Sequence, residues 1–87
     1  MDPAGSALTW LLLGHAYLGI SNIKEAASAY MRYYTIQKKI PLVDWTQSEK
    51  SQFTDGMKKL ADCLASEGRG DELARITAEL DELRSAV

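Results

Sequence analysis

The chain has 87 residues, enough for one small domain, and its 10 basic and 12 acidic residues give a net charge of −2. This balance argues against a nucleic-acid-binding protein, because such proteins carry a basic patch or stripe. The single cysteine, Cys63, excludes an internal disulfide and favours a reducing compartment, so we expect a cytoplasmic location. The apolar run over residues 7–20 is too short to cross a bilayer and follows no basic residue, so we expect neither membrane insertion nor a signal peptide.

The first predicted helix covers about residues 6–19 and carries large and small residues at fixed spacings. Trp10, Leu13 and Tyr17 fall at i, i+3 and i+7, so they share one face of the helix. Gly14 lies beside them and has no side chain. We therefore predict that this face packs closely on a second helix.

The second predicted helix covers about residues 23–39. Asn22 precedes it and Glu25 follows three residues later, which is a capping-box pattern for a helix start. Ala26 is the small residue that matches the glycine of the first helix, and Tyr30 lies one turn further on the same face. Large residues packed against small ones are what a helical hairpin needs at its contact.

Residues 41–45 form a predicted connector to the second half of the chain. Pro41 ends the second helix, because the residue before a proline is pushed out of the helical region. Thr46 and Glu49 form a second capping-box pattern, which predicts a third helix over about residues 46–66.

Gly68 and Gly70 then interrupt the helical pattern, and a fourth helix is predicted to follow them and to run to about Ser85. Its apolar residues keep the 3-4-3-4 spacing of a coiled-coil seam. They are Leu73, Ile76, Leu80, Leu83 and Val87. Such a seam packs on the neighbouring helix of its own hairpin or serves for dimerisation or docking, and both alternatives stay open.

The first two helices carry a known repeat pattern: Trp10-x2-Leu13-Gly14-x2-Tyr17, followed by Ala26-x3-Tyr30. This spacing resembles the tetratricopeptide (TPR) repeat, with Tyr in place of Phe, over about residues 7–40. Residues of about 46–85 resemble a degenerate second copy, in which Leu60-Ala61-x2-Leu64 is followed by Leu73. The two copies lie further apart than the repeat length of about 34 residues in the family.

The resemblance implies an all-α fold of four helices, arranged as two TPR-like antiparallel hairpins in a single domain of residues 1–87. The hairpins are placed at 6–40 and 46–87. A TPR is a scaffold that holds other polypeptides, so the resemblance points to binding rather than catalysis.

The first helix has a second apolar stripe, formed by Leu8, Leu11, His15 and Leu18. In TPR proteins the corresponding positions line the concave, ligand-holding face, so we predict that these four residues bind a partner. The stripe is covered either by another helix of this chain or by a partner: an amphipathic helix, a second copy or further repeats. Families that hold a C-terminal carboxylate place Lys and Asn there, so this particular clamp is not expected.

No catalytic, metal-binding or cofactor-binding pattern stands out. His15 is the single histidine, and the pair Gly68 and Gly70 does not follow a strand as a phosphate-binding loop would. We therefore predict that the chain is not an enzyme and needs no cofactor. The expected function is protein–protein interaction as an adaptor, chaperone or assembly subunit, with another protein, a peptide or a second copy as partner. A self-association module and a regulatory domain that binds a peptide or small ligand are the alternatives.

Overall fold

The computed structural model describes residues 7–85, and the predicted seam residue Val87 lies outside this range. The helices are α1 (Ala7–Gly19), α2 (Ile23–Gln37), α3 (Gln47–Ser66) and α4 (Gly70–Ser85), with a short 3-10 helix, η2 (Leu42–Asp44), before α3. Residues 7–85 contain no strand, so the predicted all-α fold is confirmed. The predicted boundaries hold to within about two residues; α2 ends at Gln37, two residues earlier than expected.

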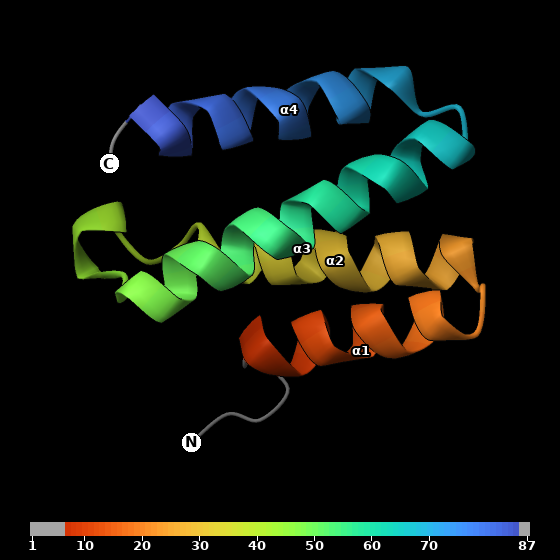
Figure 1. Ribbon diagram of the computed structural model, residues 1–87, viewed down its shortest axis with the longest axis horizontal. Helices are drawn as coiled ribbons and strands as arrows, with labels where there is room; N and C mark the ends of the chain where they lie inside the picture. The colour runs from red at the N-terminus through yellow and green to blue at the C-terminus, as the bar shows by residue number, and fades with distance from the viewer. Residues whose placement is uncertain (1–6, 86–87) are drawn as a thin grey trace.

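The helices follow one another across a flat layer of 33 × 31 × 17 Å (Figure 1). α1 and α2 lie side by side and run in opposite directions, and α4 lies at the edge opposite to α1. α1 packs mainly on α2, α2 on α3, and α3 on α4. This order of contacts is compatible with the two predicted antiparallel hairpins.

Two similar turns reverse the chain inside the hairpins. Ser21 has a φ of 62° and Gly68 a φ of 71°, so both residues take the left-handed conformation. In each turn the N–H of the next residue, Asn22 or Arg69, donates to a carbonyl five residues earlier at 2.9 Å. This bond closes the end of the preceding helix. Glycine adopts the conformation without steric cost, whereas serine is unusual there.

The capping box predicted at the start of α3 is confirmed. The Thr46 hydroxyl accepts from the Glu49 N–H at 3.1 Å, and the Glu49 carboxylate accepts from the Thr46 N–H at 2.8 Å. At the start of α2, Asn22 Oδ1 accepts from the Glu25 N–H at 3.4 Å, and the returning bond from the Glu25 side chain does not form within residues 7–85. The two hairpins are therefore capped with different completeness.

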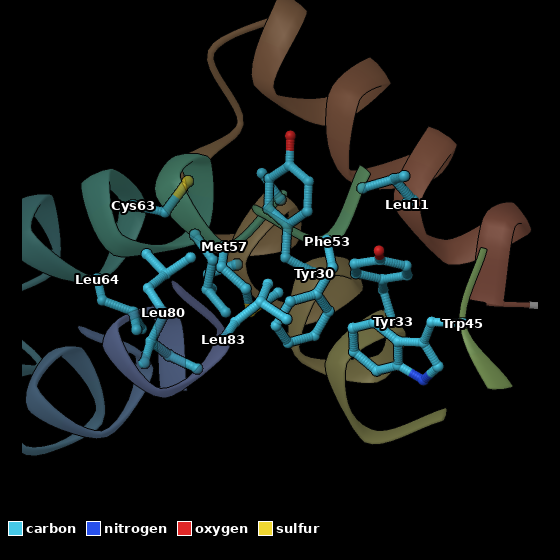
Figure 2. Packing of buried hydrophobic residues seen from close by; sticks show 14 residues of the cluster. Leu11, Tyr30, Tyr33, Trp45, Phe53, Met57, Cys63, Leu64, Leu80 and Leu83 are labelled. Carbon is cyan, nitrogen blue, oxygen red and sulfur yellow. The ribbon is translucent and has the colours of Figure 1, made fainter. Parts of the chain in front are cut away.

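Phe53 on α3 joins three parts of the core through aromatic contacts. Its ring centroid lies 4.9 Å from that of Trp45, 5.9 Å from that of Tyr33 and 6.3 Å from that of Tyr34. The Trp45 indole N–H donates to the Ile40 carbonyl at 2.9 Å, so the end of the connector is bonded to the residue that precedes it. Figure 2 shows the rings of Phe53, Trp45 and Tyr33 beside the aliphatic part of the core.

Candidate interaction surfaces

The contact between α1 and α2 is built on Gly14 and Tyr30. A Cβ atom at Gly14 would lie 2.6 Å from two ring carbons of Tyr30, so only glycine leaves room for the ring. Tyr30 is fully buried, and its side chain extends from α2 toward α1 (Figure 2). The prediction that α1 packs closely on the second helix at Gly14 is confirmed, and the group nearest to the glycine is the Tyr30 ring.

The Tyr30 hydroxyl has a partner on α1. It lies 2.6 Å from Nδ1 of His15, and the two rings meet edge to face with centroids 5.5 Å apart. Burial raises the pKa of Tyr30 to about 12, so the phenol stays neutral and serves as a hydrogen-bonding group. His15 is half-buried, and this contact occupies one of its ring nitrogens. The histidine therefore helps to join α1 to α2.

One of the four predicted partner-binding residues, Leu11, is not on the surface. It lies inside the protein with 3% of its surface exposed. Gly56 on α3 makes room for it: a Cβ atom at Gly56 would lie 2.8 Å from Leu11 Cδ1 and 3.2 Å from the Tyr33 ring. Leu11 is thus covered by α2 and α3 of its own chain and is not accessible to a partner. The sequence feature that could have indicated this contact is Gly56 itself, a glycine in the middle of a predicted helix.

The rest of the stripe is divided between core and surface. Leu18 is half-buried and packs against the core, as His15 does through Tyr30. Leu8 is 48% exposed and is the one member of the stripe with a large exposed surface. The four predicted partner-binding residues therefore do not form one open face.

An apolar surface does lie on α1, and Leu8 is the one residue that it shares with the predicted stripe. Leu12 is 57% exposed and Ile20, just after the helix, is 71% exposed. Leu13 was predicted to face its own hairpin, but it is 36% exposed. With Leu8 and the exposed Ala16 these residues form the outer face of α1, defined as Leu8, Leu12, Leu13, Ala16 and Ile20. Because α1 is apolar on all sides, the periodicity of its sequence could not indicate which side packs inward.

The predicted seam of α4 is part of the core. Ile76 is fully buried, and Leu80 and Leu83 are each 8% exposed. Leu73 is partly buried and packs against the same cluster. These residues cover α3, so the part of the seam that the structure describes is not an open apolar stripe.

A second surface, which no pattern in the sequence indicates, follows α2. It is a shallow groove lined by Lys24, Ser28, Met31, Arg32, Thr35, Ile36, Lys39, Arg69 and Glu72. The guanidinium of Arg32 lies 5.0 Å from the ring centroid of Trp10 on α1. The cationic residues of this groove are far apart in the sequence, and none belongs to a motif. They are Lys24, Arg32, Lys39 and Arg69.

Within residues 7–85, no group of three or more His, Cys, Asp and Glu side chains is placed to hold a metal ion. Cys63 on α3 is 1% exposed, and burial raises the pKa of its thiol. None of the helices in this part of the chain has the length and apolar character needed to span a bilayer.

Comparisons of the chain with protein-family models, with curated proteins and with solved structures find no match. The resemblance to TPR proteins therefore depends only on the residues of this sequence that carry it.

Proposed function

We propose that this chain is a protein–protein interaction module whose outer face of α1 holds an amphipathic helix of a partner polypeptide. The exposure of Leu12 on α1 and of Ile20 just after it carries this proposal, together with the absence of Asp, Glu, Lys and Arg from the helix. Contiguous apolar surface on a small protein marks an interaction site, because its burial removes it from water. Fully burying one leucine or isoleucine side chain contributes about 1.5–3 kcal/mol.

The spacing of the outer face suits a helix as the occupant. Leu8, Leu12, Ala16 and Ile20 repeat every four residues and so form a ridge along α1. Gly19, beside this ridge, would leave open space around an added Cβ atom. A partner helix with apolar residues at i, i+3, i+4 and i+7 would lie in such a position. A role as adaptor, chaperone or assembly subunit of the TPR type is part of this proposal.

A second copy of the chain is the alternative occupant. It is favoured by the absence of charged side chains along α1, since two copies meeting through this face would bring no like charges together. The two occupants differ in the mass of the complex that they form.

Site-specific photo-crosslinking in cells tests the proposal. A benzophenone side chain at Leu12 should give an adduct with another protein, and the cross-linked segment of that protein should form an amphipathic helix. The same group at Asp62, which is exposed on α3, is the matched control. Leu8→Asp should reduce the Leu12 adduct. An adduct of two identical chains would instead establish self-association, and equal labelling from both positions would overturn the proposal.

A further inference from the structure

We propose that the groove along α2 binds an acidic polypeptide segment of a partner, at a surface separate from the outer face of α1. Three cationic side chains border the groove on α2 and just beyond its end: Lys24, Arg32 and Lys39. All three are exposed, and none forms an ion pair with a carboxylate of the residues that the structure describes. They follow one another at eight and seven residues, or roughly 10–12 Å at the helical rise.

The acidic residue of the groove does not compensate these charges. Glu72 is bound by Arg69, whose Nε and Nη2 atoms donate to the two carboxylate oxygens at 2.6 and 2.7 Å. This pair neutralises itself, so Lys24, Arg32 and Lys39 remain as a line of positive charge. The whole chain carries a net charge of −2, so the charge of this line is opposite to that of the molecule. Such complementarity favours an acidic partner and sets its orientation.

The groove also offers apolar contacts, which favour a polypeptide over a nucleic acid. Met31 and Ile36 are half-buried and lie between the cationic residues along α2. Arg32 lies over the Trp10 ring, which orients its guanidinium. Three unpaired cations neutralise few phosphates, whereas nucleic-acid affinity depends mainly on such contacts. An amphipathic segment with acidic residues about two helical turns apart and apolar residues between them matches the groove.

Fluorescence anisotropy with the full chain tests this site. The probe is a labelled peptide of about 16 residues, long enough to follow α2, with glutamates seven to eight positions apart and leucines between them. We expect saturable binding that weakens as salt is raised, because exposed charge pairs are screened. Replacing the glutamates of the peptide with glutamine should remove most of the binding.

Lys24→Glu is the informative variant, because a carboxylate in the first turn of α2 favours the helix dipole and should leave folding intact. Its Kd for the peptide should rise about two- to tenfold, the range for reversing one exposed charge pair. Lys58→Glu, on an exposed position of α3 outside the groove, makes the same change in net charge and should leave the Kd unchanged.

Several results would overturn the assignment. Absence of peptide binding would do so, and so would equal weakening by Lys24→Glu and Lys58→Glu, which would reflect net charge alone. If Leu12→Asp loses binding while Lys24→Glu binds as the parent chain does, the peptide lies on the outer face of α1. The assignment of the groove would then be wrong, and the proposed function of the outer face would stand. Tighter binding of a single-stranded oligonucleotide of equal charge would indicate a nucleic-acid site.

Discussion

The two hairpins pack by different means. In the first, α1 meets α2 through a glycine, and the ring of Tyr30 occupies the space above Gly14. In the second, α3 and α4 meet through aliphatic side chains that are almost completely buried, among them Leu64 and Ile76. The first hairpin leaves Leu12 and Ile20 largely exposed, whereas the apolar seam of α4 is covered.

This difference shows what an amphipathic pattern contributes. α4 has a single apolar stripe with polar residues around it, so only one orientation buries its large side chains. α1 is apolar on all sides, and any orientation leaves apolar surface in water. Its orientation is therefore chosen by the glycines: Gly14 admits Tyr30, and Gly56 on α3 admits Leu11.

The largest expected effect separates the inner and outer sides of α1. Leu11→Asp should abolish cooperative unfolding, because an unpaired buried charge is costly and an average domain of this size has about 4–13 kcal/mol of stability. Leu8→Asp on the outer face should change stability by less than about 0.5 kcal/mol. Thermal melts followed by circular dichroism measure both. Equal tolerance of the two variants would mean that α1 does not face α3 as described.

Truncation in the α4 seam should come next. Ile76→Ala removes a fully buried side chain and should cost about 2–5 kcal/mol in urea melts. Leu12→Ala, on the outer face of α1, is its control and should cost less than about 0.5 kcal/mol. If the control is as costly as Ile76→Ala, the outer face is packed in solution and the interaction surface proposed for it does not exist.

The glycine contact of the first hairpin predicts a smaller cost. Gly14→Ala forces a Cβ atom against the Tyr30 ring and should destabilise the chain by about 1–3 kcal/mol. Gly19→Ala meets no atom within 4 Å and should be neutral or slightly stabilising, since alanine is the better helix former. In chemical denaturation the midpoint of Gly14→Ala should therefore fall below that of the parent chain, whereas the midpoint of Gly19→Ala should stay the same or rise. A harmless Gly14→Ala would remove the basis for the TPR-like hairpin.

The helix caps extend the comparison to the start of α2 and α3. Thr46→Ala breaks a complete capping box and should cost about 0.5–2 kcal/mol. Asn22→Ala removes one long hydrogen bond of 3.4 Å and should cost less than Thr46→Ala. Urea midpoints of the two variants decide this order, and a reversed order would contradict the difference between the caps.

The smallest expected effect is a dependence of the folding stability on pH, which comes from carboxyl groups of the second hairpin. The backbone hydrogen bond from Thr46 lowers the pKa of Glu49 below its ordinary value, and the hydrogen bond from the side chain of Arg69 lowers the pKa of Glu72. A carboxyl group whose pKa is lower in the folded state stabilises the fold above its unfolded pKa. That contribution is lost as the pH falls through the folded pKa.

Urea midpoints measured between about pH 3 and 6 should therefore decline toward acid below the unfolded pKa of about 4.3. Glu49→Gln keeps an oxygen for the cap but no longer titrates there, so its decline should be shallower. An identical slope in the variant and the parent chain would exclude Glu49 as a source of the pH dependence.

The sequence by itself was sufficient for the fold class and for the helix positions. Local signals placed the helices: the capping box at Thr46, the turn at Gly68 and the stop at Pro41 each act within a few residues. The seam of α4 was also readable, because its apolar spacing and polar surroundings leave one way to bury it. The close contact at Gly14 followed from the placement of a glycine among large apolar residues.

Only the tertiary structure decided which sides of α1 and α2 remain open. The burial of Leu11 depends on Gly56, a residue 45 positions away, and the exposure of Leu13 follows from the rotation that this contact imposes on α1. The groove along α2 is likewise a product of packing, because the turn and first residues of the second hairpin, Arg69 and Glu72, lie beside the cationic residues of α2 and its end. Contacts between distant segments set these surfaces, and a periodic pattern within one helix carries no information about them.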